Sequence, residues 1–302
     1  MKYCILITVI AASLVSIEPS SGADTDLAAF TKEMSNHSGF RKIIQQDFTK
    51  WDGNDDGRLD DEDGAIGPKG LFLTRSTFNR VDESKSNSVS LVEFLEYQIR
   101  EAFYALDLNR NDSLSDKEKK HIKKPAEFFK WLKKSQLSFI VEGDKAYLNG
   151  TTNGKVVKQF QELFKKHPEV KTLVFGWMPG SDDDEKLLKA LEIIKKHGVT
   201  THAADHARIQ SGGVDLFTVG TERTIGEDVE FGVHSWSAGR KKEGRNLDRT
   251  NRQHKPYLDY YNSVDVPADF YWFTLKAAVA DAMHVMTEEE LLKYRIITAS
   301  AE

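Results

Sequence analysis

Three twelve-residue stretches in the first half of the chain place oxygen-bearing side chains at regular intervals. They read DGNDDGRLDDED (52–63), DESKSNSVSLVE (82–93) and DLNRNDSLSDKE (107–118). Each begins with Asp, has Asp, Asn or Ser at its third, fifth and ninth positions, and ends with a carboxylate residue. Hard divalent cations bind oxygen ligands in this order, with the carbonyl of the seventh residue included. The spacing therefore predicts three loops that each enclose one cation.

The predicted ligands occupy equivalent positions, and residues 58, 88 and 113 contribute through their carbonyl oxygens. The first loop uses Asp52, Asn54, Asp56, Arg58, Asp60 and Asp63; the second uses Asp82, Ser84, Ser86, Ser88, Ser90 and Glu93; the third uses Asp107, Asn109, Asn111, Ser113, Ser115 and Glu118. Asp63 is shorter than the Glu that ends the other two loops, so a bidentate contact is harder to form. We expect weak Ca²⁺ binding in the first loop, with tolerance of the smaller Mg²⁺.

The residues before the loops repeat as well. Phe48, Phe78 and Phe103 each stand four residues before a loop, on the inner face of an expected helix. A single acidic loop is also typical of a solvated turn, but three loops with the same flank are not. Over about residues 38–124 the chain resembles the EF-hand calcium-binding family. The resemblance implies an all-α EF-hand domain over residues 24–135, with Ca²⁺ as its cofactor.

The segments that follow the loops differ. Residues 64–70 are rich in Gly and contain Pro, which opposes an exit helix after the first loop. The segment FLEYQI after Glu93 is helical in pattern, and only thirteen residues separate Glu93 from Asp107. One helix must therefore leave the second loop and enter the third. We expect these two loops to form a compact unit, and the second loop to be the better-ordered site.

The N-terminus is typical of a secreted protein. A lysine precedes the apolar run CILITVIAASLVSI, and small residues follow at 20–23, which predicts a signal peptide over residues 1–23. An N-terminal anchor is the alternative, although the run is short for a membrane span. We expect an extracellular protein with no membrane segment and, because Cys4 is the single cysteine, no disulfides. The triplets at 36–38 and 149–151 are then candidate glycosylation sites.

Composition limits the function classes. The chain has 302 residues and a net charge of -5, with both signs interspersed, which argues against a nucleic-acid-binding protein. Its length suits two modest domains. From residue 136 onward strand patterns such as VKTLVFGWM alternate with helix patterns such as DDDEKLLKALEIIKKHG. This alternation predicts an α/β domain with a largely parallel sheet over residues 136–302.

A second set of reactive residues lies in that domain. The segment MPGSDDD, around residue 178, is followed by ARIQSGGVDLFTVG (207–220) and ERTIGEDVEFGVHSW (222–236). In order and spacing these segments resemble the Clp protease and crotonase-like superfamily, over about residues 137–299. The closing pattern DAMHVMTEEELLKYRII also resembles the end of that fold.

This resemblance implies roles for particular residues. Ser211 matches the nucleophile, His234 matches the base, and Gly180 and Gly212 would supply oxyanion-binding N–H groups. A serine at the start of a helix lies in a positive partial field, which favours developing negative charge. A neighbouring imidazole can take its proton.

The third member of the catalytic set is less clear. The family's position for the acid falls on Met283, and Asp281 lies two residues before it. Asp281 would orient His234 only if the backbone shifts. Two alternatives stay open: Ser211 can cap a helix, and His234 can be a satisfied core residue.

The function that these patterns favour is a secreted calcium-binding protein with a Clp/crotonase-like domain. One alternative is a serine hydrolase acting on a peptide or acyl substrate, with Ser211, His234 and Asp281 as its catalytic residues. Another is a structural protein of an extracellular, calcified matrix with matrix partners. Relatives in the Clp family form rings, so a homo-oligomer is also open. The aromatic segment 253–273 suits a core or a subunit interface, with a binding cleft as the alternative.

Overall fold

The chain divides into two compact units, with the division between residues 134 and 135. The computed structural model describes residues 24–67, 70–72, 74–119, 135–238 and 242–298. We call 24–119 the N-terminal unit and 135–298 the C-terminal unit. The predicted signal peptide and most of the segment 121–135 lie outside the described residues. No helix of the described residues is long and apolar enough to cross a membrane.

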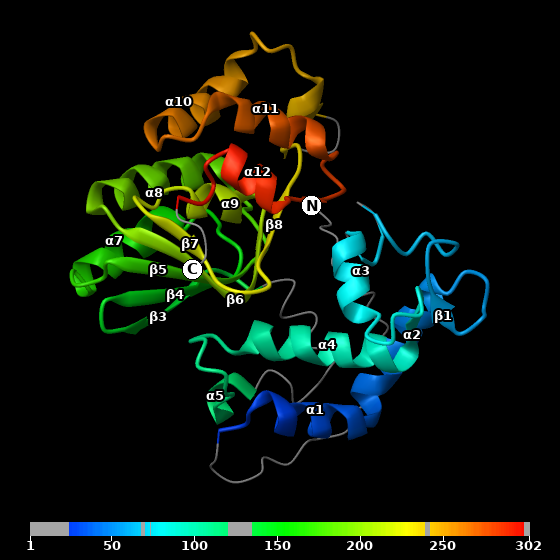
Figure 1. The fold of residues 1–302 in the computed structure, drawn as a ribbon. Helices are drawn as coiled ribbons and strands as arrows, with labels where there is room; N and C mark the ends of the chain where they lie inside the picture. The colour runs from blue at the N-terminus through cyan, green and yellow to red at the C-terminus, as the bar shows by residue number, and fades with distance from the viewer. Residues whose placement is uncertain (1–23, 68–69, 73, 120–134, 239–241, 299–302) are drawn as a thin grey trace. The chain divides into compact units, whose positions relative to one another are not determined.

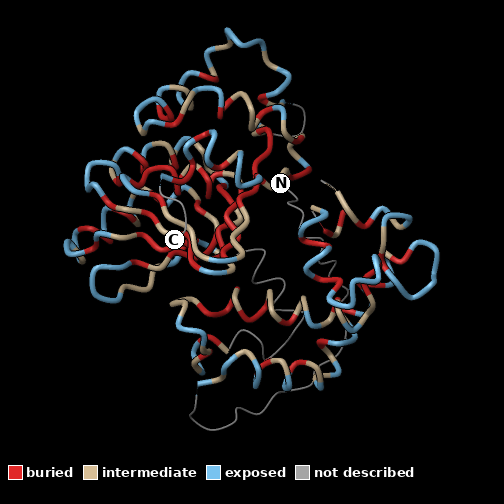
Figure 2. The backbone as a smooth tube through the Cα atoms, in the orientation of Figure 1, coloured by how far each residue is buried: buried red, intermediate tan, exposed pale blue. Residues whose placement is uncertain are grey.

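The N-terminal unit is built from helices with apolar residues at helical spacing. They are α1 (Leu27–Asn36), α2 (Ser38–Trp51), α3 (Arg75–Val81), α4 (Leu91–Leu106) and α5 (Asp116–Lys119). Their inner faces meet in a phenylalanine-rich core, in which Phe48, Phe78 and Phe103 are all buried. Phe48 packs against Phe94 of α4 at 5.8 Å between ring centroids. The flanking phenylalanines therefore fix where each loop starts. Figure 1 shows the helices of this unit, and Figure 2 shows which stretches of their backbone are buried.

Helix α4 confirms that one helix leaves loop 82–93 and enters loop 107–118. Ser90 and Glu93 form a capping box at its start, in which each side chain bonds the backbone N–H of the other. No helix follows the first loop within the described part of residues 60–74. The missing exit helix predicted from the glycines is thus confirmed.

The pairing of the loops differs from the expectation. Strand β1 (Arg58–Leu59) of the first loop pairs with β2 (Val89–Ser90) of the second, Leu59 opposite Val89. The third loop pairs instead through Leu114 with Thr25, in two hydrogen bonds of 2.8 and 3.0 Å. The prediction that loops two and three form the compact unit was wrong. The apolar residue at the eighth position of each loop takes part in the pairing, and α4 is too rigid to fold the second loop back onto the third.

The C-terminal unit contains a seven-stranded sheet in the order β11-β8-β6-β5-β4-β3, with β7 on β6. The strands are β3 (Ser138–Glu142), β4 (Lys145–Asn149), β5 (Thr172–Met178), β6 (Thr200–Gln210), β7 (Arg223–Ile225), β8 (Glu230–Val233) and β11 (His284–Val285). Strands β4, β5, β6, β7 and β8 pair in parallel, and β3 and β11 are antiparallel edges. The predicted α/β class is confirmed.

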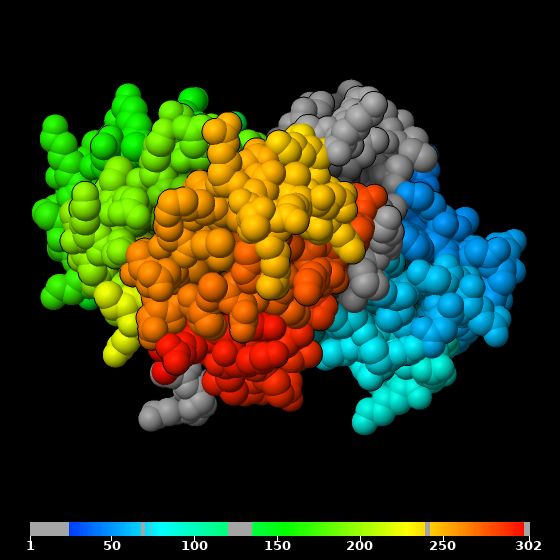
Figure 3. Space-filling model, turned by 90° about the horizontal axis from the view of Figure 1, so that it is seen from above, coloured from blue at the N-terminus to red at the C-terminus, as the bar shows by residue number. Residues whose placement is uncertain are grey.

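Helices cover this sheet. They are α7 (Val156–Lys166), α8 (Asp184–His197), α9 (Gly212–Phe217), α10 (Lys255–Ser263), α11 (Ala268–Ala277) and α12 (Glu288–Lys293). Helix α9 lies against β6 and β8, and α10 contacts both α8 and α11. Two short strands, β9 (Ser237–Ala238) and β10 (Lys242–Glu243), precede α10. Figure 3 shows α10 and α11, in orange, as one continuous surface beside α12 in red.

The burial of individual residues bears on the two candidate glycosylation sites and on the aromatic segment. Asn149 is buried and its side-chain oxygen accepts a 3.0 Å hydrogen bond from the N–H of Trp177, so it cannot carry a glycan. Asn36 is exposed at the end of α1 and stays a candidate. In the aromatic segment 253–273, Tyr261 and Tyr271 belong to the core, as expected.

Candidate functional site

Ser211 lies in the turn between β6 and α9 with an unusual backbone. Its φ is 52° and its ψ is -127°, a region that a residue with a side chain rarely adopts. The N–H of Ser211 donates a 2.8 Å hydrogen bond to the carbonyl of Gly232 in β8, which holds the turn in place. The side chain of Ser211 makes no capping hydrogen bond to α9. The helix-cap interpretation is therefore not supported.

Glycines allow other segments to approach this serine closely. A Cβ on Gly180, where φ is 138°, would lie 3.0 Å from Cβ and 3.4 Å from Oγ of Ser211. A Cβ on Gly212 would meet the Cβ of Ser181 at 2.6 Å. The turn after β5 and the start of α9 can therefore meet only because both positions are glycine. The structure brings together the two segments predicted to supply oxyanion-binding N–H groups.

His234 follows the end of β8 and is 7% exposed. Its Nδ1 lies 2.9 Å from the carbonyl of Ser235, and a carbonyl only accepts, so Nδ1 carries the hydrogen. In a neutral ring the lone pair then lies on Nε2. Burial lowers the pKa of His234, against the opposing hydrogen bond to Ser235. The imidazole is thus neutral at neutral pH and has the form of a general base.

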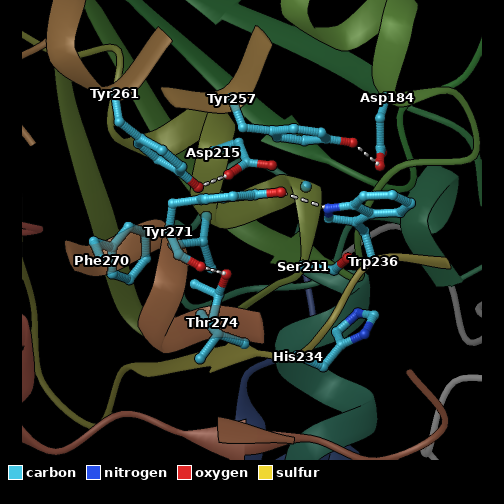
Figure 4. Close-up of a pocket in the computed structure, with 13 residues that line it drawn as sticks. Asp184, Ser211, Asp215, His234, Trp236, Tyr257, Tyr261, Phe270, Tyr271 and Thr274 are labelled. Carbon is cyan, nitrogen blue, oxygen red and sulfur yellow. Dashed lines mark hydrogen bonds between the residues drawn. The ribbon is translucent and has the colours of Figure 1, made fainter. Parts of the chain in front are cut away.

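Ser211 and His234 line the same pocket (Figure 4). The hydrogen bond that we expected between Ser211 Oγ and the imidazole is not formed. In enzymes without substrate such contacts are often loose and tighten on binding. The structure therefore places Ser211 and His234 in one pocket without joining them.

The structure places Asp281 outside the lining of the pocket that holds Ser211 and His234. It is exposed and is not among the residues that line the pocket. The register of β11 on β8 pairs His284 with Val233, so the next position sets Met283 beside His234. The contact that orients the ring at Nδ1 is the carbonyl of Ser235. A backbone acceptor replaces the acid because the strand register presents a methionine there.

Two carboxylates in the pocket were missed by the sequence analysis. Asp215 stands four residues after Ser211 on α9, and Asp184 opens α8; both line the pocket. The hydroxyl of Tyr261 donates to the carboxylate of Asp215, and that of Tyr257 donates to Asp184 at 3.0 Å. Asp215 stands only four residues after Ser211, in the motif SGGVD, which could have been noticed. The two tyrosines come from a distant segment, α10.

Both carboxyls are shifted towards the protonated form. Burial raises the pKa of Asp215 to about 7, with a further increase from the charge of Asp184 and a decrease from the Tyr261 hydrogen bond. Burial likewise raises the pKa of Asp184, against the hydrogen bond from Tyr257. The charge of Asp184 acts on Asp215. No lysine or arginine is among the residues that line the pocket.

The three loops of the N-terminal unit share one backbone conformation. Their fourth and sixth residues all have φ between 56° and 79°. These residues are Asp55 and Gly57, Lys85 and Asn87, and Arg110 and Asp112. The N–H of each first Asp bonds the carbonyl of the phenylalanine four residues earlier, at 2.9–3.0 Å. The repeat seen in the sequence is therefore a repeat in space.

The same side-chain hydrogen bonds recur in each loop. The first Asp accepts from the N–H groups of the fifth and sixth residues, as Asp82 does from Ser86 at 2.9 Å and Asn87 at 2.7 Å. Equivalent bonds are made by Asp52 and Asp107. The last carboxylate accepts from the ninth residue's N–H in every loop. Both carboxylates of each loop are thus turned inward.

Loop 82–93 brings predicted ligand oxygens together most closely. The hydroxyls of Ser84 and Ser86 lie 3.2 and 3.3 Å from Oδ1 of Asp82 and 3.2 Å from each other. The Ser86 hydroxyl is 2.8 Å from the carbonyl of Ser88. Oxygens at 2.3–2.6 Å from one Ca²⁺ would lie about 3 Å apart. Four of the six predicted ligands of this loop therefore have the spacing of a cation site.

The donor set differs from a carboxylate-rich metal site. Among the described residues, no group of three or more His, Cys, Asp or Glu side chains is arranged to hold a metal ion. Loop 52–63 contains many acidic residues, but their carboxylates do not converge on one point as the ligands of a metal ion would. In loop 82–93 the set would consist of Asp82, Glu93 and serine oxygens. Hard cations accept such neutral oxygens, at lower affinity than carboxylates.

The chain was compared with family models, curated proteins and solved structures, and the solved structures cover about half of it. No family model matches the sequence, and no curated protein matches it. A mutant of the 1510-N membrane-bound stomatin-specific protease, in complex with a substrate peptide, is 14% identical, with a TM-score of 0.35 over 50% of this chain and 73% of that chain. An enoyl-CoA hydratase/carnithine racemase from Magnetospirillum magneticum is 16% identical, with a TM-score of 0.38 over 54% of this chain and 67% of that chain. Likeness at this level concerns the fold and says nothing of the reaction of this chain.

Proposed function

We propose that the N-terminal unit is an EF-hand domain that binds Ca²⁺, with loop 82–93 as its main site. The observation that supports this is the convergence of the Asp82, Ser84 and Ser86 oxygens with the Ser88 carbonyl. The ion would add charge neutralisation and cross-link the two ends of the loop. We propose weaker sites in loops 107–118 and 52–63, the latter also for Mg²⁺.

The charge state of the loop residues supports a cation. Burial alone would raise the pKa of Glu93, but hydrogen bonds from Ser90 and Ser84 outweigh it and lower the value to about 2. Glu93 is therefore ionised at neutral pH. Asp107 is 1% exposed, and its pKa is raised chiefly by burial. A buried carboxylate without full compensation is costly, and a bound cation offsets that cost.

The affinity that we propose suits an extracellular setting. Loops with two carboxylates bind Ca²⁺ weakly, and extracellular modules work at dissociation constants of about 10⁻⁴–10⁻³ M. We propose that the protein is secreted, where Ca²⁺ at that concentration would occupy the loops and stabilise the folded state.

Calcium titration of the full chain by calorimetry tests this proposal. Glu93→Gln keeps the length of the side chain but removes its charge, and it should weaken binding to loop 82–93 by about 10-fold or more. Glu96→Gln, on the exposed face of the same helix, is the matched control and should bind as the wild type does. Absence of any heat of binding, together with no change in melting on EDTA treatment, would overturn the proposal.

We also propose that the C-terminal unit has a Clp/crotonase-like fold and acts as a serine hydrolase on a peptide or acyl substrate. The observation that supports this is the φ of 52° at Ser211 in a strand-to-helix turn. Strained turns of this kind expose the nucleophile in other serine hydrolases. The neutral imidazole of His234 in the same pocket supplies a base.

The reaction would proceed by acyl transfer. Ser211 Oγ attacks the substrate carbonyl carbon while Nε2 of His234 takes the hydroxyl proton. The oxyanion that forms accepts hydrogen bonds from N–H groups at Gly180 and Gly212. The bond to the leaving group then breaks, and that group takes the proton from His234. Water, deprotonated by His234 in turn, cleaves the Ser211 ester and releases the acid.

A fluorophosphonate probe tests the hydrolase proposal. The wild type should be labelled covalently, and Ser211→Ala should abolish the label. Ser263→Ala, an exposed serine at the end of α10, is the control and should keep it. Absence of labelling of the wild type, with and without Ca²⁺, would sink the proposal.

A further inference from the structure

The pocket beside Ser211 carries two carboxylates from different helices. Asp215 lies on α9, four residues after Ser211, and both residues line the pocket. Asp184, at the start of α8, reaches the pocket from another direction. Figure 4 shows the carboxylates of Asp184 and Asp215 on the same side of the pocket, near the aromatic rings. A substrate held at Ser211 would therefore meet both acids.

The acids of this pocket have no cationic partner among the residues that line it. The residues that line it include Asp184 and Asp215, with His234 as the nitrogen base and no lysine or arginine. Tyrosine hydroxyls donate to both carboxylates, but these donors are neutral. Two carboxylates that feel each other's charge across a partly enclosed space favour a cationic ligand.

An aromatic wall stands beside the acids. The ring of Trp236 is stacked on Tyr257 at 6.0 Å and 9°, and Tyr257 is stacked on Tyr271 at 5.4 Å and 14°. Cations are attracted to the faces of such rings, most strongly to tryptophan. The wall thus adds a second preference for positive charge.

Hydrogen bonds hold this wall rigid. Trp236 Nε1 donates to the Tyr271 hydroxyl at 2.8 Å, and His254 Nε2 donates to the carbonyl of Asp248 at 3.1 Å. Because Nε2 carries the hydrogen, Nδ1 of His254 accepts from the Tyr271 hydroxyl at 2.6 Å. The polar atoms of the wall are therefore satisfied within the protein, and the acids of the pocket have neutral hydroxyls as their partners.

The size of the pocket limits the cation. Its free volume is ≈ 40 Å³, and one water needs about 10–15 Å³ on the same measure. The space holds about three water molecules, which suits a compact ammonium group. A planar guanidinium or an aromatic side chain would need the wall to move.

We propose that this pocket selects substrates that present an ammonium group, such as a lysine side chain, to Asp215 and Asp184. The inference rests on the hydrolase function proposed above and names its substrate class. Asp215 is the main determinant because it is the nearer acid to the nucleophile along the chain and lines the same pocket. Asp184 and the ring of Trp236 complete the site.

Paired ester substrates test the selectivity. Thiobenzyl esters of Nα-acetyl-lysine and Nα-acetyl-norleucine differ only by the ammonium group. The full-length wild type should prefer the lysine ester. Asp215→Asn keeps an oxygen for the Tyr261 hydroxyl, and it should lower kcat/KM for the lysine ester by about 10- to 100-fold, mainly through KM. The norleucine ester should lose less than the lysine ester does, so the ratio of the two kcat/KM values should fall by about 10-fold or more.

A matched control and a binding measurement separate the two proposals. Asp182→Asn removes an exposed acid close to Asp184 and should leave both esters unaffected. Equal hydrolysis of the two esters by the wild type, or equal losses in Asp215→Asn, would overturn the inference. If neither ester is cleaved, the hydrolase proposal fails. Calorimetric titration of Ser211→Ala with n-butylammonium then tests the ammonium site by itself. Binding that Asp215→Asn abolishes supports the ammonium site, and absence of binding refutes it.

Discussion

The guanidinium of Arg58 donates a 2.9 Å hydrogen bond to the Ser86 hydroxyl, which is a predicted ligand in the neighbouring loop. It also donates to the Ser88 hydroxyl. Arg58 reaches these serines because β1 and β2 pair the first two loops. A fixed positive charge therefore lies against the loop in which we propose that Ca²⁺ binds.

Removing this guanidinium should strengthen calcium binding. Arg58→Leu keeps the apolar stem but removes the competing charge, and it should raise the Ca²⁺ affinity of loop 82–93 by about 2- to 5-fold, a modest gain because Arg58 is exposed. Calorimetric titration measures the change. Arg75→Leu removes a nearby arginine that forms an ion pair with Asp61 and should have a smaller effect. Equal gains in both variants would show a general charge effect only.

Gly180 should be required for catalysis. In Gly180→Ala the new Cβ meets Ser211 at 3.0 Å and must displace it, so kcat should fall by about 10²-fold. Gly198→Ala is the control, because its φ of 64° is strained as well but nothing lies within 4 Å of its Cβ. Both variants should lose stability, whereas only Gly180→Ala should lose ester hydrolysis. A similar loss in both would refute the special role of Gly180.

Asp281 should be dispensable. The residue is exposed and His234 is oriented by the carbonyl of Ser235, so Asp281→Asn should keep kcat within about 2-fold of wild type. Removing the orienting acid of a true Ser-His-Asp triad costs about 10⁴-fold in kcat. Steady-state ester hydrolysis distinguishes these values. A loss of the larger size would restore Asp281 to the catalytic set.

Asp215 should make stability depend on pH. Burial raises its pKa from 3.8 to about 7, so the folded state holds this proton more tightly than the unfolded state. The associated stability is fully present below about pH 4 and is lost as the pH rises through about 7. Asp215→Asn has no proton to lose, so its free energy of unfolding should rise relative to wild type over this range. Urea unfolding at pH 5 and pH 8 measures this, and a difference independent of pH would contradict it.

Local rules in the sequence were sufficient for the elements and for several site residues. The phenylalanine before each loop and the Asp at its start predicted where helices end, because the Asp side chain accepts N–H groups of the following loop and offers the backbone an alternative to the helix. The alternation of strands and helices after residue 136 predicted the parallel sheet. The motif IQSGGV placed Ser211 at a strand-to-helix turn, since paired glycines permit a backbone approach that other residues forbid.

Tertiary structure decided the contacts between residues far apart in the chain. Leu59 pairs with Val89 and Leu114 with Thr25, which no local pattern specified. The register of β11 on β8 replaced Asp281 by a backbone carbonyl as the partner of His234. Strand register and loop pairing depend on which apolar faces bury best together, a sum over the whole fold.

The features of the candidate site also divide into those that the sequence determined and those that only the fold determined. The sequence alone determined that Ser211 starts a helix, that His234 follows a strand, and that three loops repeat one order of oxygen ligands. Only the packing of α10 in the fold places Tyr257 in contact with Asp184 and Tyr261 in contact with Asp215. The reason is physical: spacing along a chain specifies a helix face or a loop, whereas burial, and with it charge state and pocket shape, arises only when separate elements pack together.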